Sequence, residues 1–179
     1  MDRIKSIWIP DKEWKNIQKT IPIICVDIIP IRNLKKNLKK IDFEVGLILR
    51  RSPVIKKWCF VGGRVLRGEI ITDAIRRQLN ETLGPNLKYK LNEDPQPFYV
   101  AQYFTKKNSY YGFDPRQHAI GLTYILNIEG EIMPCAEALD FKWFNCYKIP
   151  DSIEFGFQQD IILAKVLELI EQSKQKIIF

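Results

Sequence analysis

The chain has 179 residues, of which 46% are hydrophobic and 27% charged, and its formal net charge is +7. This composition is ordinary for a soluble globular protein, and the length suffices for one domain over residues 1–179. No apolar run is long enough to cross a bilayer and no signal-peptide core follows the first residues, so we expect a cytoplasmic protein without a membrane partner.

The positive charge is concentrated in part between two apolar segments, in Lys35, Lys36, Lys39 and Lys40. A basic loop of this kind can meet an anionic partner such as nucleic acid. A solvated loop is the simpler interpretation, and no aromatic residues interleave with the lysines for base stacking. We therefore favour the solvated loop over a nucleic-acid site.

The four cysteines, Cys25, Cys59, Cys135 and Cys146, lack the C-x-x-C spacing of zinc sites. Cys25 and Cys59 lie in apolar runs. We expect four reduced thiols, most of them buried.

The first half of the chain predicts one short helix followed by two strands. Residues 10–19 form an amphipathic pattern with Trp14 and Ile17 on one face. The run after Pro22 predicts a strand to residue 29, in which Asp27 is the one acid. Because an unpaired buried acid is costly, Asp27 needs an arginine, a lysine or a ligand. Residues 43–49 predict the second strand, which opens onto Arg50 and Arg51.

A strand, a glycine loop and a helix follow in residues 58–84. Residues 58–61 are apolar, and Gly62 and Gly63 allow a sharp turn after them. Thr72 is the predicted N-cap of the helix, and Gly84 is its predicted C-cap.

The second half predicts further strands over residues 98–104, 118–128 and 139–145, with a turn at Glu129-Gly130. The loop 105–117 carries aromatic residues that could clamp a base or a sugar, or pack on a neighbouring subunit. A last amphipathic helix is predicted over about residues 154–174. Its apolar positions are Phe157, Ile161, Ala164, Leu167 and Ile170.

The stretch 62–84 resembles the Nudix box. Its positions in register are Gly63, Glu69, Arg77, Leu79, Glu81 and Gly84. The fold class that this resemblance implies is α/β (α+β), a Nudix-type mixed β-sheet sandwiched between α-helices. Gln78 and Thr82 stand where the box has two further glutamates, so Glu81 is the one remaining carboxylate of the metal-binding cluster.

Within the Nudix family, the chain is most similar to the GDP-mannose mannosyl hydrolase branch. The shared features are Thr20-Ile21-Pro22 before Asp27, the pair Arg50-Arg51, Trp58 before Gly62-Gly63-Arg64-Val65, His118, and Lys142-Trp143. That branch keeps the third glutamate of the box, whereas this chain keeps the second, a rotation of about 100° around the helix. The branch also has a general-base histidine where this chain has Ala138 or Leu139.

The resemblance implies a homodimer and a bound divalent ion, Mg²⁺ or Mn²⁺. The implied roles are catalytic for Arg64, Arg51 and Asp27, substrate-binding for Arg50, His118 and Tyr103, metal-binding for Gly63, Glu81 and Glu137, and structural for the pair Glu69 and Arg77. His118 also fits a purely structural histidine. The dimer would form through the N-terminal helix and the first strand, where Trp14 and Ile17 offer an apolar face.

Three functions follow from these residues. The first is metal-dependent hydrolysis of a nucleotide-sugar such as GDP-mannose or GDP-glucose, by attack of water at the sugar carbon. The second is a Nudix pyrophosphatase that cleaves another nucleoside diphosphate derivative at phosphorus. The third is a module that binds a nucleotide or nucleic acid without cleaving it, because Gln78, Thr82 and Ala138 replace catalytic residue types.

Overall fold

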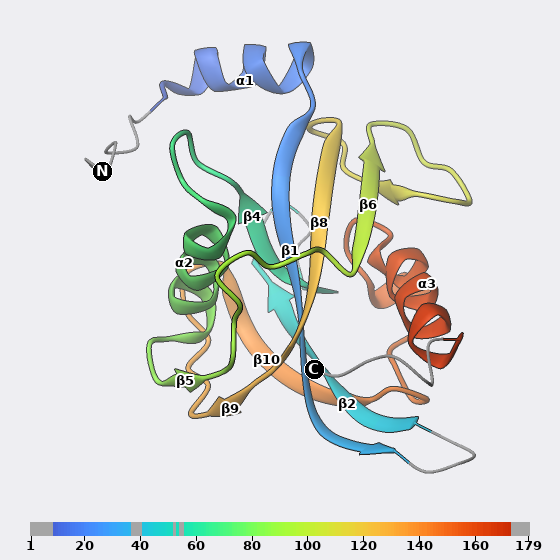
Figure 1. The fold of residues 1–179 in the computed structure, drawn as a ribbon. Helices are drawn as coiled ribbons and strands as arrows, with labels where there is room; N and C mark the ends of the chain where they lie inside the picture. Colours follow the sequence, from blue (N-terminus) through green and yellow to red (C-terminus); the bar gives the residue numbers. More distant parts are fainter. Residues whose placement is uncertain (1–8, 37–40, 52, 54–55, 173–179) are drawn as a thin grey trace.

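The computed structural model describes residues 9–36, 41–51, 53 and 56–172 (Figure 1). The helices are α1 (Asp11–Thr20), α2 (Ile71–Leu83) and α3 (Gln159–Gln172), with a 3₁₀ turn at Ser152–Glu154. The strands are β1 (Ile23–Lys36), β2 (Ile41–Arg50), β3 (Lys57–Cys59), β4 (Val61–Arg64), β5 (Leu87–Lys88), β6 (Tyr99–Phe104), β7 (Gly112–Phe113), β8 (Ala119–Asn127), β9 (Glu129–Gly130) and β10 (Ala138–Asn145).

The strands form a curled mixed sheet with the order β10-β2-β1-β8-β6-β7, with β3 paired to β2 and β4 to β1. β1 runs parallel to β8, whereas β1 pairs antiparallel with both β2 and β4. Figure 1 shows α2 and α3 on either side of this sheet, while α1 lies at one end of β1. The α+β architecture with a mixed sheet between helices is therefore confirmed.

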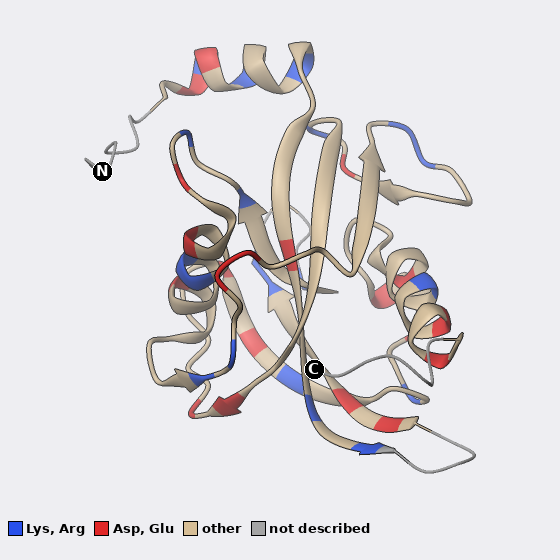
Figure 2. Ribbon diagram, viewed as in Figure 1, with Lys and Arg blue, Asp and Glu red and all other residues tan. Residues whose placement is uncertain are grey.

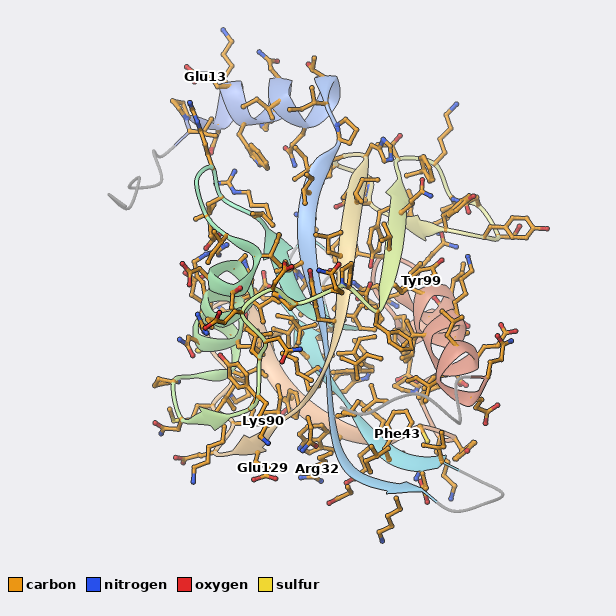
Figure 3. The ribbon with its side chains drawn as sticks, in the orientation of Figure 1. Glu13, Arg32, Phe43, Lys90, Tyr99 and Glu129 are labelled. Atoms are coloured by element: carbon orange, nitrogen blue, oxygen red, sulfur yellow. The ribbon has the colours of Figure 1, made fainter. Side chains whose placement is uncertain are left out.

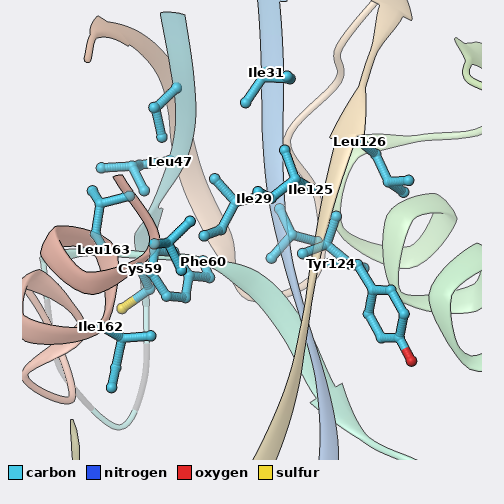
Figure 4. Packing of buried hydrophobic residues seen from close by; sticks show 14 of the residues in the cluster. Ile29, Ile31, Leu47, Cys59, Phe60, Tyr124, Ile125, Leu126, Ile162 and Leu163 are labelled. Carbon is cyan, nitrogen blue, oxygen red and sulfur yellow. The ribbon is translucent and has the colours of Figure 1, made fainter. Parts of the chain in front are cut away.

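The apolar core fills both spaces between sheet and helices. Figure 4 shows the part that packs between the sheet and α3, with Ile29 of β1, Leu47 of β2 and Phe60 facing Ile162 and Leu163 of the helix. On the other side of the sheet, the buried residues of α2 include Ala74, Ile75, Leu79 and Leu83.

Of the two predicted caps of α2, the N-cap is wrong and the C-cap is right. The N-cap of α2 is Ile70, and Thr72 lies inside the helix, where its hydroxyl donates to the Glu93 carbonyl at 3.0 Å. A competing acceptor in the 84–98 connection thus takes the hydroxyl that was expected to cap the helix. Gly84 does end α2, with φ of +89°, as predicted for a C-cap glycine.

The last helix starts later and buries a different stripe than predicted. Phe157 and Gln158 have φ of +57° and +51°, so the regular helix begins only at Gln159. Its buried face consists of Gln159, Ile162, Leu163, Val166 and Ile170. Of the predicted stripe within this helix, only Ile170 belongs to that face; Ile161 and Leu167 are half-buried and Ala164 is exposed.

The register of β1, β4 and β8 collects polar residues on one face of the sheet. Cys25 pairs with Arg64 and with Gly121, and Asp27 pairs with Gly62 in β4. Because alternate residues of a strand share a face, Cys25, Asp27 and Arg64 lie on the same side of the sheet. This face is where the candidate site is found.

Figure 2 shows both acidic and basic positions on α1 and on α2. Lys35 is exposed at the end of β1, whereas Lys39 and Lys40 lie outside the described residues. Among the described residues, no helix is long and apolar enough to span a membrane. All four cysteines are free thiols, and Cys59 and Cys146 are buried.

Gly62 permits the close approach of β4 to β1, since a Cβ at this position would lie 2.2 Å from the Val26 carbonyl oxygen. We expect Gly62→Ala to push the strands apart and to lower the free energy of unfolding by about 1–3 kcal/mol. Urea denaturation would measure this change. Val100→Ala, on a half-exposed position of β6, is the control and should cost about 0.5 kcal/mol or less. Equal stability of Gly62→Ala and the unchanged chain would contradict the steric argument.

Candidate active site

Arg77 of α2 connects the helix to the loop that follows β4. Its Nε donates to one oxygen of Glu69 at 2.7 Å, and its Nη2 donates to the other at 2.9 Å. Nη2 also donates to the Arg64 carbonyl at 3.0 Å, and Nη1 reaches Glu81 at 3.3 Å. One guanidinium thus fixes the glycine loop and the motif helix relative to each other, the bracing that the resemblance implies for Glu69 and Arg77.

The Glu69 carboxyl is stabilised in its charged form. Burial would raise its pKa, but hydrogen bonds from Arg77 and from the Leu66 amide outweigh burial, and the pKa lies below its usual value. The charged pair is partly shielded from water, with side-chain exposures of 22% for Arg77 and 12% for Glu69. Partial burial makes such a pair stronger than an ion pair at the surface.

Gln78 is turned toward the loop and is 8% exposed. In the amide orientation that satisfies both neighbours, it donates to the Gly62 carbonyl at 3.3 Å and accepts from Arg77 at 2.8 Å. A Cβ on Gly63 would lie 2.6 Å from the side-chain amide of Gln78. Gln78, which replaces a glutamate of the box, therefore packs against the loop at Gly63, where the lack of a side chain leaves room for it.

Asp27 is 7% exposed and accepts a hydrogen bond from the Tyr103 hydroxyl at 2.8 Å. Tyr103 in turn accepts from Gln159 at 3.3 Å, and the other end of Gln159 accepts from the Phe60 amide at 2.8 Å. Gly121 makes room for the carboxylate, since a Cβ there would lie 2.2 Å from Asp27 Oδ2. A hydroxyl, rather than the predicted salt bridge, is the direct partner of this acid.

Burial raises the pKa of Asp27 to about 6, although the Tyr103 hydrogen bond and the charge of Arg50 lower it. Burial, reinforced by Asp27, also raises the pKa of Tyr103 well above its usual value, so the phenol keeps its proton and donates. Burial likewise raises the pKa of Cys25 to about 12, with Asp27 and Asp114 adding to the effect and Arg116 and Arg50 opposing it. The neutral Cys25 thiol is thus surrounded by two acids and two arginines.

Glu137 forms a bidentate ion pair with Arg50 across the β2–β10 edge of the sheet. The two contacts between guanidinium nitrogens and carboxylate oxygens are 2.6 and 2.5 Å, and the side chains are 13% and 28% exposed for Arg50 and Glu137. Burial raises the pKa of Glu137, opposed by Arg50 and Arg116, and the nearby Glu81 raises it further. Arg51 is exposed, and its backbone amide donates to the Glu137 carbonyl at 2.8 Å.

The predicted metal ligands offer the right atoms but only a small set. Among the described residues, no three His, Cys, Asp or Glu side chains gather as a metal-binding group. Glu81 is 57% exposed and Glu137 lies close enough to feel its charge. Carboxylate oxygens and a backbone carbonyl such as that of Gly63 are hard ligands, which Mg²⁺ and Mn²⁺ accept together with water and substrate phosphates. The residues therefore fit an ion that is coordinated in large part by its substrate.

Arg64 points toward α1, with its guanidinium 4.2 Å from the centroid of the Trp14 ring. Gln18 of the same helix donates to Gln117 at 2.7 Å. No residue of α1 is buried, and Figure 3 shows Glu13 on its outer side, away from the sheet. α1 is therefore joined to the rest of the protein by side chains that border the candidate site.

Arg116 is a candidate binding residue that the sequence did not single out. Its Nε and Nη2 donate to Asp114 at 2.9 and 2.8 Å, and Asp114 is 4% exposed. The guanidinium groups of Arg50 and Arg116 lie 5.6 and 5.3 Å from the centroid of the Phe157 ring. In the sequence, the one signal for Arg116 is Asp114, two residues earlier, which could hold its guanidinium in place. Nothing in the sequence indicates that both Arg116 and Arg50 lie over Phe157.

His118 is not brought together with the other predicted residues. Its ring stacks on Phe104 with centroids 4.8 Å apart, and Phe104 follows Tyr103 in β6. Consecutive strand residues point to opposite faces, so His118 lies on the face away from Asp27. Its Nε2 is buried without a hydrogen-bond partner among the described residues. In the aromatic loop, Tyr110 and Tyr111 are exposed, and Tyr111 packs edge-on against Phe104.

A hollow of about 1090 Å³ lies elsewhere, between the connection 88–98 and β8. Lys90 and Glu129, labelled in Figure 3, line it together with Phe98 and Tyr124. None of the residues described above contributes to it. The motif and this hollow are therefore two different candidate locations for the functional site. The charged groups favour the location at the motif.

Residues 4–172 match the family described as "Domain of unknown function (DUF4916)". The chain belongs to this family. A relative from Haloferax volcanii, described as "Low-salt glycan biosynthesis protein Agl8", is 33% identical over 79 residues, which are 42% of this chain and 44% of that protein. The match thus spans less than half the length of the relative.

Solved structures share the fold. A Jonesia denitrificans protein, described as a "possible asymmetric diadenosine tetraphosphate (Ap(4)A) hydrolase", is 29% identical with a TM-score of 0.73, over 85% of this chain and 96% of that one. A NUDIX-family hydrolase from Clostridium perfringens is 17% identical with a TM-score of 0.58, over 85% and 98%. A bifunctional NMN adenylyltransferase/ADP ribose pyrophosphatase from Francisella tularensis, complexed with AMP and a Mn ion, is 17% identical with a TM-score of 0.59, over 88% and 44%. The fold is therefore of the Nudix type.

The raised pKa of Asp27 predicts a pH-dependent stability. Its pKa rises from 3.8 to about 6 on folding, so between these values the folded chain keeps a proton that the unfolded chain loses. The free energy of unfolding should therefore fall as pH rises through this window, by about 3 kcal/mol from this group. In Asp27→Asn this contribution is absent, while the amide oxygen can still accept from Tyr103. Urea denaturation at pH 4 and pH 7 measures both proteins, and identical pH dependence would contradict the assignment.

Proposed function

We propose that this protein is a divalent-metal-dependent hydrolase of a nucleoside diphosphate derivative, with a nucleotide-sugar such as GDP-mannose as the leading substrate. The observation that carries the proposal is a group of arginines, of which Arg50 and Arg116 both lie over the Phe157 ring, 5.6 and 5.3 Å from its centroid. Arg64 lies opposite Cys25 in the sheet register. Guanidinium groups on one face next to the motif loop suit a diphosphate, which arginine contacts bidentately.

In this proposal, Arg64, Arg50 and Arg51 contact the diphosphate oxygens and stabilise the charge that develops on the leaving group. Glu81, Glu137 and the Gly63 carbonyl would bind the divalent ion, which supplies charge neutralisation on that diphosphate. Asp27 and Tyr103, on the sheet, contact the nucleotide or its sugar. Ala138 stands where the branch has a general base, so we expect a rate lower by about 10²–10⁴ than with such a base.

The sugar-nucleotide choice is supported by the glycan biosynthesis description of the Haloferax volcanii relative. It is supported also by the retained Trp58 and Gly62-Gly63-Arg64-Val65 pattern. Attack at the sugar carbon would release nucleoside diphosphate and free sugar.

A second candidate is cleavage at phosphorus in another nucleoside diphosphate derivative. It is favoured by the description of the 29%-identical Jonesia denitrificans structure as a dinucleoside polyphosphate hydrolase. A third is nucleotide binding without turnover. It is favoured by Gln78, whose amide packs against the loop, and by Glu137, whose carboxylate is paired with Arg50.

Turnover in ¹⁸O-labelled water separates these candidates. With Mg²⁺ or Mn²⁺ and GDP-mannose or GDP-glucose, we expect GDP and a sugar that carries the label. Label in GMP or sugar phosphate, or cleavage of diadenosine tetraphosphate alone, would favour attack at phosphorus. Glu81→Gln should lower the rate about 10²-fold or more, whereas Glu168→Gln, on an exposed position of α3, should leave it unchanged. Absence of turnover with GDP-mannose, GDP-glucose and diadenosine tetraphosphate would contradict both hydrolase candidates.

We also propose a homodimer through α1 and the start of β1. Ile21 and Ile24 are 54% and 53% exposed, next to a helix that buries no residue within the chain. Light scattering should give twice the chain mass of 21.1 kDa. Ile21→Lys should shift the mass toward one chain, and Ile153→Lys, at a position that is 80% exposed elsewhere, should not. A monomeric unchanged protein would refute the dimer.

A further inference from the structure

The backbone around Glu137 is anchored on two sides. The Cys135 amide donates to the Thr82 carbonyl at the end of α2, at 3.0 Å, and the Arg51 amide donates to the Glu137 carbonyl at 2.8 Å. Ala136 between them has φ of +50°, which is unusual for a residue with a side chain. The main chain thus positions Glu137 between the motif helix and β2, and its carboxylate can turn without moving that main chain.

While it is paired, the Glu137 carboxylate binds a cation less readily, because the positive charge of Arg50 lies beside it. Both of its oxygens contact Arg50, at 2.6 and 2.5 Å. Glu81, the exposed carboxylate of α2, is near enough to repel it. Arg50 therefore neutralises one of two like charges that would otherwise face each other.

The partner that could replace Glu137 on Arg50 is an anion. Arg116 also lies on the Phe157 ring, close enough to lower the pKa of Glu137. Its side chain is 40% exposed, and it donates to Asp114 through Nε and Nη2. Phosphate oxygens match the bidentate geometry that Glu137 now satisfies on Arg50. Arg116, over the same aromatic ring as Arg50, offers a second positive charge for such an anion.

We propose that a phosphoryl anion takes the place of Glu137 on Arg50, with Arg116 as a second contact, and that the released Glu137 carboxylate then joins Glu81 in binding the divalent ion. This inference rests on the proposed function and adds Arg116 and an exchange of partners to it. No covalent bond changes in this step.

The exchange makes the binding of anion and ion mutually favourable. A cation that binds alone must compete with Arg50 for Glu137, and an anion that binds alone leaves two carboxylates to repel each other. When both bind, the cation neutralises the two carboxylates and the anion neutralises the guanidinium of Arg50. Thermodynamic linkage requires the same factor in both directions, so the anion tightens the cation as much as the cation tightens the anion.

The test measures Mn²⁺ binding by electron paramagnetic resonance, without turnover. In the full chain, Arg50→Met leaves Glu137 without its ion-pair partner, and we expect Mn²⁺ to bind about tenfold more tightly, which corresponds to about 1.4 kcal/mol. The double variant Arg50→Met/Glu137→Gln should lose this gain. Arg32→Met, which breaks the Arg32–Glu44 ion pair between β1 and β2, is the matched control and should not alter Mn²⁺ affinity.

Inorganic sulfate, which complexes Mn²⁺ only weakly, serves as the anion at constant ionic strength. It should tighten Mn²⁺ binding to the unchanged protein but not to Arg50→Met, and Arg116→Gln should weaken this effect. If Arg50→Met does not fold by circular dichroism, Arg50→Lys replaces it, since lysine keeps the charge but loses the bidentate contact. Mn²⁺ affinity that is independent of Arg50 and sulfate would overturn the exchange and leave the hydrolase proposal standing. Absence of Mn²⁺ binding in every variant would overturn both.

Discussion

The charged contact between Arg77 and Glu69 is the constraint on which the rest of the candidate site depends. It ties the loop after β4 to α2 through two hydrogen bonds, and a third from Arg77 reaches the Arg64 carbonyl. Because the pair is partly shielded from water, it sets the distance between Gly63 and Glu81 more firmly than an exposed pair would.

A second constraint comes from placing an acid inside the sheet. Asp27 is accommodated because Gly62 and Gly121, its neighbours in β4 and β8, have no side chains to occupy the space that the carboxylate needs. Tyr103 supplies the direct hydrogen bond, and Arg50 supplies a more distant charge. At neutral pH, the charged and buried Asp27 lowers the stability of the fold, but it keeps a carboxylate on the face that carries the arginines. Such arrangements are common at functional sites.

The sequence predicted what depends on local pattern and spacing. The two glycines and the apolar pattern after them were enough to predict the loop and the helix, and the resemblance to the Nudix box implied the ion pair of Glu69 with Arg77. Thr72 failed as a cap because an acceptor in a distant connection takes its hydroxyl. Arg50 and Glu137 are 87 residues apart, and no periodicity links an arginine at a strand end to a glutamate before the last strand. Such pairs are set by the strand order, which local pattern does not encode.

In the proposed metal site, two carboxylates of the box are missing, and an arginine is paired with Glu137. A cluster of three acids binds a cation through its own charge, whereas a site with an exposed Glu81 and a half-buried Glu137 must draw more of that charge from substrate phosphates. Before substrate arrives, an unpaired Glu137 would be a partly desolvated charge, which is unfavourable. Arg50 removes that cost in the empty site, and it is also the side chain that a phosphate attracts most directly. The same guanidinium can therefore stabilise the fold without ligand and contact the ligand when it binds.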